Sequence, residues 1–442
     1  MPYVRGVVRD ENGNLAARTV RLYERATGKL LGEKTSDAAT GEYLFYVDTA
    51  SEAYRVVLDD ATVTPILNDL GARVLPGTPA AFLPPWESGA VDGVFEYAAR
   101  VFVPEAEPAS ISVVGGQYTP LNTSKWDTAV LAPNGKIYSA PRESAFGVLV
   151  MDLATEESYT IALGAVAGTS LWMHAALGLD GKVYAPPFSA DSVLIIDPAT
   201  DAVSFSPAVP RPQEAAQRGG VFAPDGRLYS PPYKDDYILS YDPAAQRFYA
   251  FGNEIAASTD YRYNGFSLAP NKKMYAAPNR ASSILEFDPV SKRVATFGDL
   301  STATNKWTKA AVAPNGALYA APYSPGNPVL KFDPVSGTVT TIAAPNAAWS
   351  TPVLGPNGKL YAAPYQDTTF FLEIDPMTDT LREFGYFDDS STTAYFYKSG
   401  VMSPSGDIFF VPSRASRYLK LSFSKSPAEP LSYDFLCSIY IA

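Results

Sequence analysis

The sequence repeats one short pattern seven times, and this repeat is the feature that most constrains the fold. Each copy places a tight-turn sequence before a short segment that contains an aromatic residue and ends in proline. The aromatic residues lie 42 to 48 residues apart. A period of this length, with turn signals inside each copy, is typical of a propeller or a solenoid. The aromatic positions are Tyr138, Tyr184, Tyr229, Tyr275, Tyr319, Tyr361 and Phe409.

The pattern inside one copy, residues 305–342, favours the propeller. An alternating run leads to Pro314-Asn315-Gly316, a tight turn in which Asn-Gly tolerates positive φ. A second strand follows and ends at Pro322, which cannot donate to a strand ladder. A hairpin with Asp333-Pro334 at its bend completes four strands, the unit of a propeller blade. The sequence therefore predicts an all-β protein with a seven-bladed β-propeller over residues 111–442.

The ends of the repeat array predict how the ring closes. Residues 111–116 read as an outer strand without a blade of its own, and the last copy has three clear strands that end at 418–424. We expect 111–116 to pair beside 418–424, which would leave no open sheet edge at the seam. The alternating tail 431–442 is the alternative donor of this strand.

Residues 1–83 form a separate unit in this interpretation. Short strand-like runs alternate with turn residues, which predicts a small β-sandwich of about seven strands. Residues 84–110 contain several prolines and lack periodicity, and we interpret them as a linker.

Composition excludes several partners and sites. The net charge of −11 argues against nucleic acid or an anionic membrane as a partner. No apolar stretch is long enough to span a bilayer, and the first residues lack the apolar core of a signal peptide. Cys437 is the only cysteine, so an intrachain disulfide and a cysteine metal cluster are excluded.

The first quarter of the chain resembles the carboxypeptidase-regulatory-like, or transthyretin-like, β-sandwich in the form found in bacteriophage tail proteins. The resemblance rests on VRGVVRDENGNLAARTVRLYERATGKLLGEKTSDAATGEYLF, followed by VVLDD at 56–60, LNDL at 67–70 and RVLP at 73–76. The propeller copies are similar to repeats in phage and bacterial proteins of unassigned activity.

These resemblances imply a non-enzymatic virion component of the tail, made in the host cytoplasm without a signal peptide. Residues 1–83 would dock on other tail proteins, and the propeller would bind a host glycan or receptor, within a homo-oligomer. Neither resemblance brings catalytic, cofactor or metal residues. The alternatives are a lyase or glycan-degrading propeller enzyme and a purely structural spacer.

The enzyme alternative has few candidate residues. Similar enzyme propellers, such as streptogramin lyases and gluconolactonases, use a histidine or a carboxylate–asparagine metal cage in the channel, and His174 is the only histidine here. Asp127 and Asn264 occupy equivalent channel positions, but one carboxylate is too few for a hard-cation cage. The other blades carry Met173, Arg218, Thr308, Ser350 and Lys398 there. We therefore predict no catalytic, cofactor or metal site.

One further register contains four of the five tryptophans. It lies seven residues before the proline of each tight turn, or before Leu179 where that proline is missing. It predicts a ring at one mouth of the channel, which would either pack blades together or present stacking faces to a sugar or a partner. The ring comprises Trp126, Trp172, Gln217, Tyr263, Trp307, Trp349 and Tyr397, and its six aromatic members are the candidate binding residues.

Two other features bear on binding. Lysine and arginine residues near this ring predict a positive mouth and hence a charged polysaccharide as ligand; they are Lys125, Arg218, Lys306, Lys309 and Lys398. The loops 142–147, 188–192, 233–237 and 323–328 vary between blades, as recognition loops on a fixed scaffold do.

Overall fold

The chain divides into two compact units, Met1–Val94 and Phe95–Ala442. The computed structural model describes the backbone of five strands in the first unit. In the second unit it describes residues 103, 105–120, 123–210, 217–252, 255, 261–302, 305–387 and 397–425.

The described strands of the first unit form two small antiparallel sheets. In one sheet β1 (Tyr3–Val7) pairs with β4 (Glu42–Tyr46). In the other, β2 (Thr19–Glu24) pairs with both β3 (Leu30–Thr35) and β5 (Tyr54–Leu58). The other residues of 1–83 and most of the linker at 84–110 lie outside the described residues, so the complete sandwich and the linker stay predictions.

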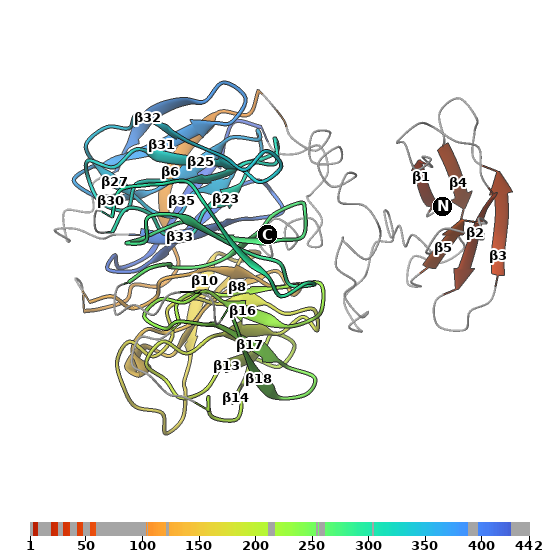
Figure 1. The fold of residues 1–442 in the computed structure, drawn as a ribbon, viewed down its shortest axis with the longest axis horizontal. Helices are drawn as coiled ribbons and strands as arrows, with labels where there is room; N and C mark the ends of the chain where they lie inside the picture. Colours follow the sequence, from red (N-terminus) through yellow and green to blue (C-terminus); the bar gives the residue numbers. More distant parts are fainter. Residues whose placement is uncertain are drawn as a thin grey trace. The chain divides into compact units, whose positions relative to one another are not determined.

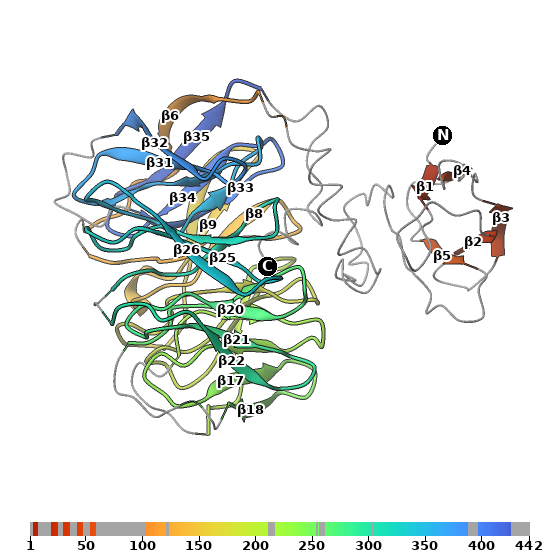
Figure 2. The same ribbon diagram turned by 45° about the horizontal axis from the view of Figure 1, so that its top comes forward.

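The second unit is a seven-bladed β-propeller, as the repeat predicts (Figures 1 and 2). Each blade is a sheet of four antiparallel strands. The first four blades consist of β7 (Val130–Leu131), β8 (Lys136–Ser139), β9 (Val148–Asp152) and β10 (Glu157–Ile161); β11 (Ala176–Leu177), β12 (Val183–Ala185), β13 (Leu194–Asp197) and β14 (Ala202–Phe205); β15 (Val221–Phe222), β16 (Leu228–Ser230), β17 (Ile238–Asp242) and β18 (Arg247–Phe251); and β19 (Ser267–Leu268), β20 (Met274–Ala276), β21 (Ile284–Phe287) and β22 (Val294–Phe297).

The remaining blades follow the same plan. They consist of β23 (Ala311–Val312), β24 (Leu318–Ala320), β25 (Val329–Asp333) and β26 (Thr338–Ile342); β28 (Val353–Leu354), β29 (Leu360–Ala362), β31 (Phe370–Asp375) and β32 (Thr380–Tyr386); and β33 (Tyr397–Met402), β34 (Ile408–Pro412), β35 (Tyr418–Phe423) and β6 (Pro108–Val114). Blade 6 has an additional pair, β27 (Ala348–Trp349) with β30 (Pro364–Gln366). The short 3-10 helix η2 (Ser144–Phe146) lies between β8 and β9.

Strand β6 closes the ring, which confirms the predicted seam. It pairs antiparallel with β35, and Ile111 lies opposite Leu421 and Val113 opposite Leu419. Figures 1 and 2 show this orange strand beside the blue strands of the last blade. The strand begins at Pro108, so the propeller starts a few residues before the predicted boundary at 111. The alternative donor, 431–442, lies outside the described residues.

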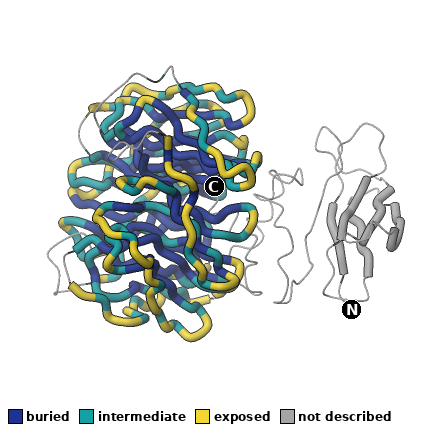
Figure 3. Tube along the Cα trace, turned by 90° about the horizontal axis from the view of Figure 1, so that it is seen from below, coloured by how far each residue is buried: buried dark blue, intermediate teal, exposed yellow. Residues whose placement is uncertain are grey.

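Burial follows the position of a strand within its blade. The first two strands of the blades are almost wholly buried, whereas the outer strands alternate between exposed and half-buried residues (Figure 3). Apolar side chains pack across the gaps between blades. Tyr319 of blade 5, for example, lies in one buried cluster with Trp349, Leu360 and Leu372 of blade 6.

In blades 1, 4 and 5 the repeated Asn links its blade to the hairpin of the next. Asn315 Nδ2 donates to Tyr319 Oη at 3.2 Å and to the Pro376 carbonyl of the next blade at 2.8 Å. Tyr319 Oη in turn donates to Asp379 of that blade at 2.8 Å. The most conspicuous part of the repeat is therefore a structural link between blades.

The same link operates at the seam with a different partner. Asn357 Nδ2 donates to the carbonyl of Ala106 at 2.8 Å, and the Val103 N–H donates to the Pro356 carbonyl. Residues just before β6 thus take the place of the next blade's hairpin. The hairpin aspartates bind their own turns as expected, since Asp333 Oδ1 accepts from the Val335 N–H at 2.8 Å.

Candidate functional site

The predicted aromatic ring exists as one structural register. Each member forms a β-bridge with the proline that ends the second strand of its own blade. The pairs are Trp126 with Pro141, Trp172 with Pro187, Gln217 with Pro232, Tyr263 with Pro278, Trp307 with Pro322, Trp349 with Pro364 and Tyr397 with Pro412. We call these seven side chains the packing ring.

The packing ring is buried, so it does not present stacking faces. None of its members is more than 4 % exposed. The indole N–H of Trp126 donates to the Gly147 carbonyl at 2.9 Å, and Trp349 makes the same bond to Phe370. Each bond fixes the start of the third strand in the same blade. The interpretation as a binding platform is therefore wrong for these side chains, because their faces are covered, and the alternative of packing is supported.

Two of the predicted cations next to this ring are also buried. Lys125 and Lys306 are at most 1 % exposed. Lys306 Nζ donates to the Ala281 carbonyl at 2.8 Å, and burial lowers the pKa of Lys306 to about 8. Both ammonium groups donate to loop carbonyls.

Three of the residues that directly follow packing-ring members come together, namely Asp127, Arg218 and Lys398. Side chains from blades 1, 3 and 7 meet at Asp127: Lys398 lies 2.9 Å, Arg142 3.5 Å and Arg218 3.9 Å from its carboxylate oxygens. Ser413 Oγ also donates to Asp127 at 3.2 Å. A network that joins these blades must lie inside the central channel.

A second ring of residues was not recognised as a ring from the sequence, although four of its members begin the predicted recognition loops 142–147, 188–192, 233–237 and 323–328. It consists of the residue that directly follows the closing proline of each second strand, and we call it the post-proline ring. Its sequence signal is simple, because the proline is present in every blade whereas the residue after it differs from blade to blade. The members are Arg142, Phe188, Tyr233, Asn279, Tyr323, Tyr365 and Ser413.

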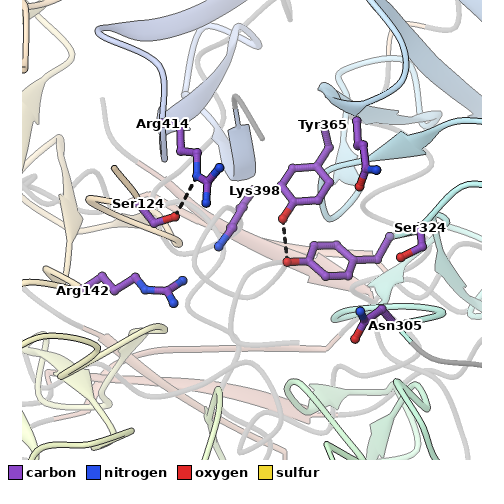
Figure 4. A pocket seen from close by; sticks show the side chains of 9 residues that line it. Ser124, Arg142, Asn305, Ser324, Tyr365, Lys398 and Arg414 are labelled. Carbon is purple, nitrogen blue, oxygen red and sulfur yellow. Dashed lines mark hydrogen bonds between the residues drawn. The ribbon is translucent and has the colours of Figure 1, made fainter. Parts of the chain in front are cut away.

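A pocket of about 280 Å³ opens between the post-proline residues of blades 1, 5 and 6 and the last blade. Arg142, Lys398 and Arg414 supply positive charge on one side, and Tyr323 and Tyr365 supply hydroxyl groups on the other (Figure 4). The tyrosine hydroxyls lie 2.7 Å apart. Arg414 Nε donates to Ser124 Oγ at 3.4 Å. The remaining lining residues are Asn305, Ser324 and Gln366.

Titratable groups in the channel experience positive charge. Burial alone would raise the pKa of Asp127, but Lys398, Arg142 and Arg218 hold it well below its ordinary value. Burial likewise opposes ionisation of Tyr323, yet Lys398 and Arg218 lower its pKa. The channel therefore has an excess of positive charge inside a protein whose net charge is −11.

His174 lies in the same electrostatic environment. Burial, and then the charge of Arg218, lower the pKa of His174 to about 3. The imidazole is therefore neutral at physiological pH and is a weak base. Lys309, another predicted cation of this mouth, has its pKa lowered to about 8 by burial.

Within the described ranges, no three His, Cys, Asp or Glu side chains gather in a way that could hold a metal ion. No helix in the described part of the chain is long and apolar enough to cross a membrane.

Neither a protein-family model nor a curated protein sequence matches this chain. Solved structures match its fold at low identity. A catalytically inactive virginiamycin B lyase from Staphylococcus aureus, solved with quinupristin, is 15% identical with a TM-score of 0.57 over 71% of this chain and 99% of that chain. A streptogramin B lyase is 14% identical with a TM-score of 0.59 over 71% and 98%.

Two further neighbours come from other kinds of protein. The extracellular domain of a hybrid two-component system from B. thetaiotaomicron is 12% identical with a TM-score of 0.53, over 70% of this chain and 39% of that chain. The WD40 repeats of RRP9 are 12% identical with a TM-score of 0.55 over 72% and 100%. At these identities the likeness concerns the fold alone. The chain is an all-β protein with a seven-bladed β-propeller.

Proposed function

We propose that this chain is a non-enzymatic binding component of a bacteriophage tail. Residues 1–83 attach it to other tail proteins, and the propeller presents a channel mouth to the host surface. The attachment role comes from the resemblance of the first quarter of the chain to sandwiches of phage tail proteins. The chain would act within the virion as a homo-oligomer, with a host glycan or receptor as the second partner.

The observation that carries the binding role is the pocket at the channel mouth. Its charged groups are already held in place, because Asp127 accepts contacts from Lys398 and Arg142, and Ser413 supports Asp127. A site that is ordered before the ligand arrives loses less entropy on binding. Tyr323 and Ser324 of the loop 323–328 also line this pocket, and so does Arg142 of the loop 142–147. Both loops vary between blades.

The propeller fold alone does not separate binding from catalysis, because two of the structural neighbours are lyases. The electrostatics of His174 favours binding. A general acid must carry a proton at the working pH, and an imidazole with a pKa of about 3 does not. The positive groups instead suit an anionic ligand that is held and not transformed.

The location of the chain in a particle tests this proposal. Particles are purified from the phage whose genome encodes the chain, and antibodies against the propeller are applied for immunogold electron microscopy. We expect gold at the tail, and we expect purified chain to reduce adsorption of the particles to host cells. Absence of the chain from the particles would overturn the virion role. Labelled tails with unchanged adsorption would favour a structural spacer.

A separate assay tests the enzyme alternative. The purified chain is incubated with host surface polysaccharide, and products are followed by mass spectrometry. We expect no fragments over hours. Release of unsaturated or hydrolysed fragments, lost on changing His174→Ala, would establish catalysis in place of simple binding.

A further inference from the structure

The channel-mouth pocket has an unusual charge for this protein. Three of its lining side chains are cationic, namely Arg142, Lys398 and Arg414, and none is acidic. The carboxylate beneath them, Asp127, already has Lys398, Arg142 and Arg218 around it. One negative charge therefore faces four positive ones in a chain whose net charge is −11. The exposed carboxylate of Asp367 accepts from Gln366 at the rim, 3.3 Å away, and leaves an excess of positive charge.

We infer that this pocket binds an acidic sugar residue, with the carboxylate held by Arg414, Arg142 and Lys398 and the sugar hydroxyls held on the tyrosine side. This inference rests on the proposed function, because it names the class of ligand that the propeller would bind on the host.

The positive side of the pocket fits a carboxylate. Two arginines approach the same space from blades 1 and 7, and Figure 4 shows their side chains directed toward Lys398 between them. Arginine presents a planar set of donors that matches the two oxygens of a carboxylate. Arg142 and Lys398 are kept in position by Asp127, which is a positioning residue in this inference.

The neutral side of the pocket fits a sugar better than a bare anion. Tyr323 and Tyr365 stack with ring centroids 4.7 Å apart, and their hydroxyls are bonded at 2.7 Å. A tyrosine hydroxyl can both donate and accept hydrogen bonds, as the hydroxyls of a sugar can. Ser324, Asn305 and Gln366 add hydroxyl and amide groups around them. An inorganic anion needs only the cations, whereas a sugar ring has several hydroxyls that require such partners.

The volume sets the size of the ligand. At about 280 Å³ the pocket is close to the lower end of the range for small-molecule sites, which is about 300 Å³. One acidic monosaccharide unit, with its chain continuing out of the mouth, is consistent with this space. Such a unit is what a charged surface polysaccharide would offer.

Titration of the full chain with sodium D-glucuronate, followed by NMR, tests the inference. D-glucose serves as the neutral sugar and sodium sulfate as the bare anion. We expect glucuronate to bind in the millimolar range or tighter, with glucose and sulfate each weaker by about tenfold or more, because each lacks one half of the interactions. Raising the salt concentration should weaken glucuronate binding.

Two variants locate the site. Arg414→Gln removes one cation that is only partly buried and should weaken glucuronate binding by about tenfold or more, whereas the control Arg293→Gln removes an exposed cation of the β21–β22 hairpin and should change nothing. Tyr365→Phe should weaken glucuronate but leave sulfate unchanged. Circular dichroism and thermal melting verify that each variant is folded.

Three results would overturn the inference. Equal binding of glucose and glucuronate would remove the role of the cations. Equal binding of sulfate and glucuronate would reduce the pocket to an anion site without sugar recognition. Unchanged binding in Arg414→Gln would place the ligand elsewhere. Because these measurements use purified chain, a negative result leaves the tail location standing, and failure to find the chain in particles leaves the sugar site standing.

Discussion

The packing ring and the post-proline ring lie next to each other and both contain buried side chains, yet they differ in composition and in the groups that they contact. The packing ring is nearly uniform, buried and bonded within its own blade. The post-proline ring contains an arginine, a serine, an asparagine, a phenylalanine and three tyrosines, and three of its members, Arg142, Tyr323 and Tyr365, line the pocket. Uniformity between blades therefore marks the residues that build the ring. Variation between blades marks the residues that give one mouth its chemistry.

Both rings depend on a closed circle of blades. This circle can be opened at the seam without changing any residue of either ring. A fragment that begins at residue 115 lacks β6, and it exposes the edge of β35 together with apolar residues that pack near Trp126 and Tyr397. We expect this fragment to aggregate, because an unpaired strand edge promotes association. Size-exclusion chromatography and near-ultraviolet circular dichroism measure the outcome.

The matched control begins at residue 95, the first residue of the second unit. It keeps β6 and the contacts of Val103 and Ala106 with the turn at Asn357. We expect it to be monodisperse and folded. A folded, monodisperse fragment from residue 115 would show that pairing of β6 is dispensable.

The packing ring itself should control stability. Changing Trp349→Ala removes a fully buried indole and its bond to the Phe370 carbonyl, and we expect the free energy of unfolding to fall by about 3–5 kcal/mol. Tyr386→Ala, in the outer strand of the same blade, removes a 64 % exposed ring and should cost about 0.5 kcal/mol or less. Urea denaturation compares the two variants. Similar costs for both would contradict the distinction between packing and surface positions.

Much of the propeller could be predicted from the sequence because its signals are local. The Pro-Asn-Gly turns and the Asp-Pro hairpins recur with one period, so the number of blades and the β6 seam follow from counting. The register of Trp126, Trp307 and Trp349 was likewise visible. The sequence did not show whether those side chains are covered, because this depends on the neighbouring blade.

The pocket could not be predicted in the same way. Arg142, Tyr323 and Lys398 are far apart in the sequence and belong to blades 1, 5 and 7. They come together only because the ring closes and brings these blades to one axis. A variable residue after a repeated proline would have identified part of the set, but Arg414 and Lys398 lie at other positions. The charge balance around Asp127 likewise requires the distances between blades.

The smallest expected effect concerns His174, whose pKa depends on the charges of the channel side chains. In the unfolded chain the imidazole takes up a proton below about pH 6.5, whereas in the folded protein it stays neutral down to about pH 3. Stability is therefore unaffected by this group above pH 6.5 and falls as the pH is lowered from 6.5 toward 3, because the unfolded chain binds the extra proton. Since the side chain is only partly covered, we expect the wild type to lose about 1–2 kcal/mol relative to His174→Gln between pH 7 and pH 4.

The single histidine allows a direct measurement. Its ring resonances can be followed by NMR without assignment, and we expect no titration above pH 4. Addition of glucuronate should raise the pKa of His174, because the bound carboxylate offsets the charges of Lys398 and Arg218 that lower it. Glucose should leave this pKa unchanged. An ordinary pKa near 6.5 in the free protein would contradict both the burial of His174 and the excess of positive charge around it.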